Sequence, residues 1–212
     1  MSDQNPVQNL LLSTAYFPPV HYLALIANSH NILIEKEENY HKQTFRNRCY
    51  ILSSNGPLAL IVPVMLGSFH KTALKETRID YSKRWQQIHI RGITSSYRSS
   101  AYLLYYFDMV EKVISRNHKY LIDLNMDSLE TLLCITGLTN RIGFTKSYLP
   151  ASQAPDDFRY KIMPKKDFPG VVHSSREYYQ VFSNRIGFVP QLSTLDLIFN
   201  VGPESHGYLC GG

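Results

Sequence analysis

The fold is decided by residues 9–35, which read NLLLSTAYFPPVHYLALIANSHNILIE. The apolar run over residues 9–17 predicts a buried strand, and the two prolines that follow favour the first turn of a helix. Residues 20–28 are apolar on almost every side, so this helix should be largely buried. Residues 31–35 predict a second strand. We therefore expect two adjacent parallel strands and a Rossmann-like N-terminus in an α/β fold.

A β-hairpin is predicted next. Residues 45–52 and 58–65 are apolar runs on either side of Ser53-Ser54-Asn55-Gly56, and Asn-Gly tolerates the positive φ that tight turns need. Pro63 lacks a donor, which places the second strand at an edge or a bulge. With the parallel strands, the hairpin predicts a mixed sheet with helices packed on it. Two further short strands are expected, at residues 77–80 and 143–148.

Three helices are predicted in the middle of the chain, where apolar residues recur with helical period. Ser82 and Ser100 are suited to cap the first two, and Gly137 is suited to end the third.

The C-terminal third is expected to combine an irregular segment with two helices. Residues 150–170 are rich in proline and charge and predict a long surface excursion. Ser174 with Glu177, and Ser193 with Asp196, are spaced as capping boxes at the start of helices.

Size and composition favour one globular domain over residues 1–212, with 44% hydrophobic and 18% charged residues. The net charge of +5 and a pI near 9.0 favour an anionic partner such as a nucleotide sugar, a phosphate or a nucleic acid. The basic residues form no run of five or more, so a nucleic-acid partner is disfavoured.

Several classes of protein are disfavoured by what the sequence lacks. The three cysteines are far apart without C-x-x-C spacing, which argues against a disulfide framework or a zinc ribbon. The histidines show no metal-ligand spacing on a helix, so neither a metal nor a cofactor is expected. Because no stretch of about 18 apolar residues and no basic leader occurs, we expect no membrane span and a cytoplasmic location.

The densest polar segment, residues 35–48, directly follows a predicted buried strand. Within it Arg46 and Arg48 flank Asn47 in a predicted strand, so alternation would place both arginines on one face. Paired guanidinium groups suit a phosphate or carboxylate, and an exposed anion-binding arginine would contribute little to stability. The alternative is a solvated, charged hairpin face.

Two histidines are candidates for ligand binding or proton transfer. His21 stands in the first turn of a helix, whose free N–H groups attract anions, although it could also cap the helix or pack beneath the loop. Trp85 and His89 are spaced i and i+4, so they meet on one helix face. They could line a sugar or base pocket, or form a buried pair.

The polar residues Ser193, Asp196, Asn200, Glu204 and Ser205 form a second constellation near the C-terminus. Asp196 is interpreted as a capping residue, whereas the other residues from Asn200 onward would be available to a ligand. We expect Asn200 and Glu204 to share a cleft with Arg46 and Arg48, or with Asn47 on the opposite face of the strand.

These segments resemble the WbqC-like family. The stretches that carry the resemblance are residues 16–22, 42–48, 61–64, 79–80 and 192–205, with Trp85 and His89. The resemblance spans about residues 15–205. It departs from the family's pattern at residues 13–15, where longer members carry His-Gln-Pro, and at residues 150–170, which stand in place of a glycine-rich segment.

The resemblance implies an α/β protein tied to O-antigen and similar surface-polysaccharide gene clusters. The first hypothesis is an enzyme that acts on an activated amino sugar or on its acyl or aminoacyl donor, with transferase as the enzyme class considered. The second is a non-catalytic protein that binds a nucleotide or another pathway protein, which the missing His-Gln-Pro favours. In the first, His21, His89 and Glu37 would be catalytic. Ligand contacts would come from Gln43, Arg46, Asn47, Arg48, Trp85, Asn200, Glu204 and Ser205.

Overall fold

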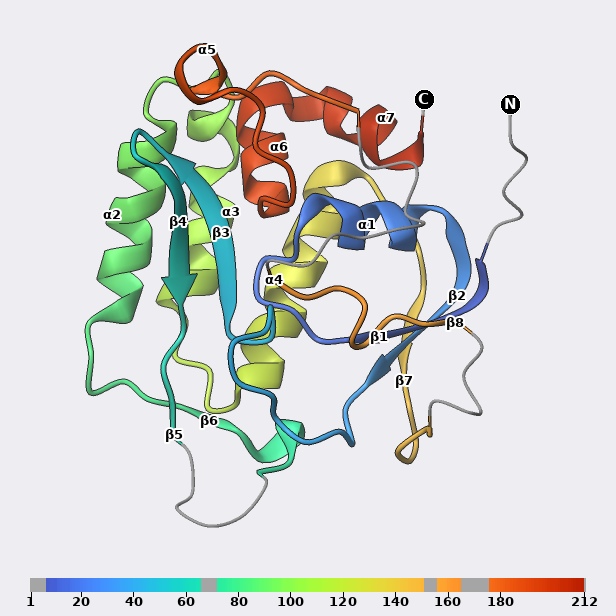
Figure 1. Ribbon diagram of the computed structural model, residues 1–212. Coiled ribbons are helices and arrows are strands. Elements are labelled where there is room, and N and C mark those ends of the chain that lie inside the picture. Colours follow the sequence, from blue (N-terminus) through green and yellow to red (C-terminus); the bar gives the residue numbers. More distant parts are fainter. Residues whose placement is uncertain (1–6, 66–71, 151–155, 165–175, 212) are drawn as a thin grey trace.

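The computed structural model describes residues 7–65, 72–150, 156–164 and 176–211. Its centre is a parallel four-stranded sheet in the order β7-β2-β1-β8, with helices packed around it (Figure 1). The α/β class is therefore confirmed. The strands are β1 (Val7–Ser13), β2 (Ser29–Glu35), β7 (Ile142–Phe144) and β8 (Asp156–Asp157).

The predicted strand–helix–strand unit forms as expected. β1 and β2 pair in parallel, with Leu10 opposite Ile32, and α1 (Val20–Ala27) connects them. The helix is buried from Val20 to Ile26, in keeping with its apolar surface on every side. β1 ends four residues earlier than predicted, at Ser13, because the chain then turns through Phe17, whose φ is 36°.

The predicted hairpin is also present, with different bounds. β3 (Arg48–Ser53) pairs antiparallel with β4 (Gly56–Ile61), and Gly56 has a φ of 103° at the turn. The hairpin is a separate two-stranded sheet. A third sheet pairs β5 (Val64–Met65) with β6 (Arg78–Ile79).

The position at which β3 begins alters the placement that was predicted for Arg46 and Arg48. Because β3 begins at Arg48, Arg46 and Asn47 lie in turns before the strand. The alternation that placed Arg46 and Arg48 on one face was therefore wrong for Arg46.

The three central helices are α2 (Trp85–Tyr97), α3 (Leu103–Ser115) and α4 (Leu121–Thr136). The last ends at Gly137 in the left-handed region, as predicted. The first two begin after Arg84 and Tyr102, so Ser82 and Ser100 do not cap them. In Figure 1, α4 lies between the parallel sheet and the side of the molecule formed by α2, α3 and the hairpin. Within the described part of the chain, no helix combines the length and apolar character needed to cross a membrane.

The C-terminal third corrects two expectations. The segment 150–170 is not only a surface excursion, because it supplies β8 to the central sheet. Residues 176–180 form no helix, and a short helix α5 (Ser183–Ile186) follows them; Ser174 lies outside the described residues.

The chain ends in three linked helical turns. They are α6 (Thr194–Val201), a 3₁₀ turn (Gly202–Glu204) and α7 (Ser205–Cys210). Ser193 caps α6, since its side chain accepts a hydrogen bond from the backbone N–H of Leu195. Asp196 does not cap the helix with its side chain, contrary to the prediction. Its carboxylate instead binds side chains of other segments, including Tyr97 of α2.

Candidate functional site at the carboxyl edge of the sheet

The carboxyl ends of the four parallel strands meet at one edge, which is where ligands bind in open α/β sheets. Polar side chains collect there from segments far apart in sequence. Ser13 ends β1, Glu35 ends β2, Thr145 follows β7, and Asp157 ends β8. All four belong to one hydrogen-bonded network, which extends to Arg159.

Arg159 joins two of these strand ends. Its Nη1 lies 3.3 Å from Oε2 of Glu35, and its Nε and Nη2 bind both carboxylate oxygens of Asp157 at 3.0 and 2.7 Å. The hydrogen bond to Asp157 raises the pKa of Arg159. Burial alone would raise the pKa of Asp157, but the hydrogen bonds and charge of Arg159 outweigh it and lower that pKa. The pair is therefore ionised, and it fixes β8 to β2.

Glu35 is fully buried, but its carboxylate is hydrogen-bonded to several donors of the protein. Its carboxylate accepts hydrogen bonds from the Thr145 hydroxyl at 2.6 Å and from the backbone N–H groups of Glu37 and Leu149 at 2.8 and 3.0 Å. A buried carboxylate needs such donors, because an unpaired one would cost several kcal/mol, on the order of the penalty for an isolated buried ion.

Arg46 forms the second ion pair of this network. Its Nε and Nη2 bind the two carboxylate oxygens of Glu38 at 2.9 and 2.6 Å, and Nη2 also donates to the Ser13 hydroxyl. Only 2% of Arg46 and 1% of Glu38 is exposed. The expectation of an exposed arginine with little effect on stability was therefore wrong. Its remaining nitrogen, Nη1, forms no hydrogen bond with the described residues.

An asparagine of α4 is hydrogen-bonded to the backbone of Arg46 and to a neighbour of Ser13. The Asn125 amide donates to the Thr14 hydroxyl at 2.9 Å and to the Arg46 carbonyl at 2.8 Å. Ser13 and Thr14 thus both lie inside the network.

Aromatic side chains form an exposed rim over the two guanidinium groups. The Tyr160 ring lies 5.6 Å from the Arg46 guanidinium and 5.9 Å from that of Arg159, and the Tyr148 ring lies 5.1 Å from the latter. Nε2 of His41 lies 3.4 Å from the Tyr160 hydroxyl. Because Tyr148 and Tyr160 are exposed, this rim offers ring faces to a ligand.

The hollow beneath the rim is small. It is lined by Ser13, Thr14, Arg46 and Arg159 among others, and has about 10 Å³ of free space. That is about the room that one water molecule needs. A ligand would therefore lie on the rim and reach the network from outside.

The predicted histidines are buried in the core, and neither lines the hollow beneath the rim. Burial lowers the pKa of His21 to about 3. His89 is 1% exposed; its Nδ1 accepts from the Tyr16 hydroxyl at 2.9 Å and its Nε2 donates to the Ile61 carbonyl at 3.2 Å. Burial lowers its pKa to about 4. Trp85 and His89 do meet on one face of α2, with ring centroids 5.1 Å apart.

The other residues predicted near β2 are spread around the edge. Glu37 is half-buried and forms an ion pair with Lys75 at 2.6 Å, and Gln43 is exposed with a φ of 60°. The Asn47 amide donates to the Val62 carbonyl. Arg48 is half-buried in β3.

The residues predicted near the C-terminus are Asn200, Glu204 and Ser205. The Asn200 amide donates to the Asp196 carbonyl, Glu204 is exposed, and Ser205 is buried. None of the three lines the hollow beneath the rim. A cleft shared by these residues and Arg46 stays a prediction.

Sequence reasoning missed several residues of this edge. Glu35, Glu38 and His41 lie in the polar segment that it singled out, so their density was a usable signal. Arg159 and Tyr160 gave no such signal, because they lie in a segment interpreted as a surface loop. Among the described residues, no three His, Cys, Asp or Glu side chains are grouped so as to hold a metal.

Comparisons with known proteins identify the family of the chain. Residues 14–167 match the WbqC-like protein family. The chain is also 27% identical over 230 residues to "Uncharacterized protein Rv1507c" of Mycobacterium tuberculosis (strain ATCC 25618 / H37Rv), which covers 94% of this chain and 96% of that protein. No solved structure matches the chain.

Proposed function

Since this chain belongs to the WbqC-like protein family, we propose that it is an enzyme of surface-polysaccharide biosynthesis, acting on an activated amino sugar or on its acyl or aminoacyl donor. The observation that supports this most is the ionised network at the carboxyl edge of the sheet. It is buried, it unites all four strand ends, and an aromatic rim with a histidine lies over it.

The charges of the network suit an amine. Three carboxylates, those of Glu35, Glu38 and Asp157, face the two guanidinium groups of Arg46 and Arg159. Counting these five groups alone, one negative charge is left over, which favours an ammonium group on the ligand. The charge of Lys161 also acts on Asp157 from outside this set.

The exposed rim would position the sugar. The faces of Tyr148 and Tyr160 are accessible to a pyranose ring, and both rings lie against a guanidinium group. We assign proton transfer to His41, which is exposed at the rim, and not to His21 or His89. Protonating those two is costly, because burial lowers their pKa values to about 3 and about 4. In acyl transfer, His41 would take a proton from the ammonium group, and the free amine would then attack the acyl carbon of the donor. The carrier of the acyl group would leave as the new amide bond forms.

A second candidate function is non-catalytic binding of a nucleotide or another protein. The specific observation that favours it is that all carboxylates and both guanidinium groups of the network already have partners, with room for about one water among them. Such an edge could be purely structural, and the ligand would then bind elsewhere.

Turnover separates the two functions. The protein would be incubated with nucleotide-activated amino sugars and with acetyl-coenzyme A or an aminoacyl donor, and products would be followed by mass spectrometry. We expect a mass increase of one acyl or aminoacyl group on the sugar. It should be lost in His41→Ala and Tyr160→Ala and kept in the exposed controls His30→Ala and Tyr179→Ala. Binding without any product would overturn the enzyme and support the second function.

A further inference from the structure

A larger cavity lies on the hairpin, next to the candidate site. It has a volume of about 350 Å³, and its walls come from Phe45, Tyr50, Pro57, Pro164 and residues 189–192. Ligand pockets commonly measure about 300–1,000 Å³, so this one would hold a single ring system but not a whole activated sugar. A ligand seated here must extend beyond the cavity.

The chemistry of the walls favours a flat ring. Phe45 and Tyr50 contribute aromatic faces, at 6.2 Å between centroids in an edge-on arrangement, and three prolines contribute rigid apolar surface. Gln191 adopts a φ of 64°, in the left-handed region that a non-glycine residue rarely occupies. Such conformations concentrate at ligand sites, where the surrounding structure holds them in place.

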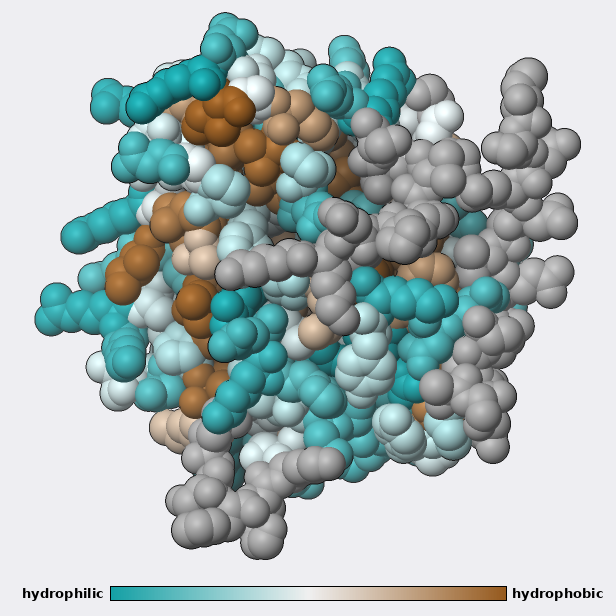
Figure 2. Space-filling view, viewed as in Figure 1, coloured by the Kyte–Doolittle hydropathy of each residue, from teal (hydrophilic) through white to brown (hydrophobic). Residues whose placement is uncertain are grey.

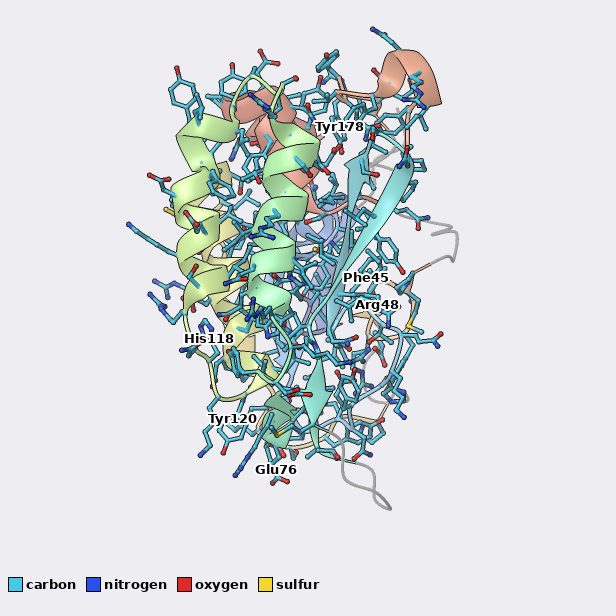
Figure 3. The ribbon with its side chains drawn as sticks, turned by 90° about the vertical axis from the view of Figure 1, so that its left-hand side faces the viewer. Phe45, Arg48, Glu76, His118, Tyr120 and Tyr178 are labelled. Atoms are coloured by element: carbon cyan, nitrogen blue, oxygen red, sulfur yellow. The ribbon has the colours of Figure 1, made fainter. Side chains whose placement is uncertain are left out.

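Arg48 supplies a positive charge beside this cavity. It stands two residues from Tyr50 in β3, so both side chains project from the same face of the strand. Its Nε is buried and has no hydrogen-bond partner within the part of the chain that the structure describes. Figure 3 labels Phe45 and Arg48 one above the other at the lower end of β3. An unpaired guanidinium N–H here suits an anionic group of a ligand.

The cavity and the carboxyl edge are neighbours. Phe45 lines both the cavity and the small hollow of the edge. The charges of Arg48 and Arg46 both act on the Tyr40 hydroxyl and lower its pKa, so both arginines lie near the same tyrosine. The cavity therefore adjoins the edge network at Phe45, and Arg48 stands two residues from Tyr50 of the cavity wall.

We infer that the cavity binds the base of a nucleoside diphosphate, with Arg48 on its phosphates, so that the group attached to the phosphates reaches the carboxyl edge. This inference rests on the proposed function and names the class of its activated substrate. An uncharged substrate would leave the buried Nε of Arg48 without an anionic partner. The flat apolar cavity, the unpaired guanidinium N–H and the shared Phe45 together fit a ring joined to an anionic link.

Calorimetric titration tests this assignment with defined probes: four nucleoside diphosphates, their nucleosides, and pyrophosphate. At least one diphosphate should bind more tightly than its nucleoside and than pyrophosphate. Arg48→Ala should weaken that binding by about 10- to 100-fold, the range for a hydrogen bond to a charged group. The exposed helix residue Arg91 gives a matched control, Arg91→Ala, which should change nothing.

Filling the cavity gives an independent variant. Val189→Trp should abolish binding of both the diphosphate and its nucleoside, and the backbone bonds of Val189 to Gln180 do not depend on its side chain. Ile88→Trp, at an exposed position of α2, controls for the added ring, and thermal melts check that the variants fold. Failure of every diphosphate to bind, or binding that both Arg48→Ala and Val189→Trp leave unchanged, would overturn the inference.

The two proposals can fail separately. If activated sugars are turned over and the turnover is insensitive to both cavity variants, only the nucleotide assignment is overturned. If a diphosphate binds and both cavity variants abolish its binding, yet no sugar is modified, only the enzyme is overturned.

Discussion

The molecule buries carboxylates in two regions and stabilises them differently. At the carboxyl edge of the sheet, Glu38 faces the guanidinium of Arg46, and Glu35 faces that of Arg159. These are ion pairs between groups that are almost fully buried. They lie beneath the exposed rings of Tyr148 and Tyr160. On the face that Figure 2 shows, the lower half is mainly hydrophilic.

The second region is the start of α6, where Asp196 has no cation. Its carboxylate accepts hydrogen bonds from the hydroxyls of Tyr97 and Tyr178 at 2.7 Å each and from the Gln180 amide at 2.9 Å. Burial raises its pKa to about 6, although these three hydrogen bonds act in the opposite direction. With neutral donors only, the pKa of this carboxylate therefore lies about one unit below neutral pH.

The difference indicates which region is suited to ligand chemistry. Asp196 connects α6, α2 and the segment 176–180 inside the core, so its role is to hold these segments together. The edge network pairs its carboxylates with guanidinium groups and lies directly below an exposed aromatic rim. Ion pairs are costly to bury and seldom add net stability over apolar packing. Their presence at the edge therefore supports the site that we propose there.

The largest expected effect is at the edge. Arg46→Met removes the partner of Glu38 and should lower the free energy of unfolding by about 3–5 kcal/mol, the cost of leaving a buried charge unpaired. Adding Glu38→Leu should recover most of this loss, since both charges are then gone. Urea denaturation measures both variants. A loss below about 1 kcal/mol would show that the pair is solvated like a surface ion pair.

Asp196→Ala should cost about 2–3 kcal/mol, because it leaves buried donors of Tyr97, Tyr178 and Gln180 without an acceptor. A second measurement follows from the raised pKa. The native state takes up the proton first, so the parent gains stability relative to Asp196→Asn as the pH falls from 7.5 to 5, by about 1 kcal/mol. A parent that loses stability relative to Asp196→Asn on acidification would contradict a raised pKa.

His89 should show the opposite dependence on pH. Its native pKa of about 4 lies below the usual 6.5, so stability is present above pH 6.5 and is lost as the pH falls towards 4. Between pH 7.5 and 5 the parent should lose about 2 kcal/mol that His89→Gln does not lose. The exposed His30→Gln should follow the parent. Equal acid sensitivity of parent and His89→Gln would mean that His89 is protonated in the folded state.

The smallest expected effect is that of Ser13→Ala. The Ser13 hydroxyl connects Arg46 with the Arg159 carbonyl, but Arg46 keeps both bonds to Glu38 without it. The loss of stability should therefore be about 1 kcal/mol, the value of one hydrogen bond. If thermal melts show a loss close to that of Arg46→Met, Ser13 and not Glu38 is the main partner of the guanidinium.

Local sequence patterns determined much of the fold. The apolar helix between two apolar strands, the Asn-Gly turn and the helix stop at Gly137 all formed as predicted, since each depends on periodicity or on a residue's own backbone preference. The meeting of Trp85 and His89 followed from helix geometry alone. The polar segment 35–48 was recognised for the same reason, because charge density is visible without a fold.

Tertiary structure alone decided the partners of those residues. Ser13 and Arg159 are separated by 146 positions, and no local pattern records that β8 returns to the sheet beside β1. Arg46 became a buried ion-pair residue because the chain turns through it before β3 begins, whereas a local pattern predicted a strand. Asp196 has the spacing of a capping residue, but the hydroxyls of Tyr97 and Tyr178 reach its carboxylate. The chemistry of each side chain, and so the kinds of group it can bind, is given by the sequence. Which of those groups lies within hydrogen-bond distance depends on how segments far apart in the chain pack together.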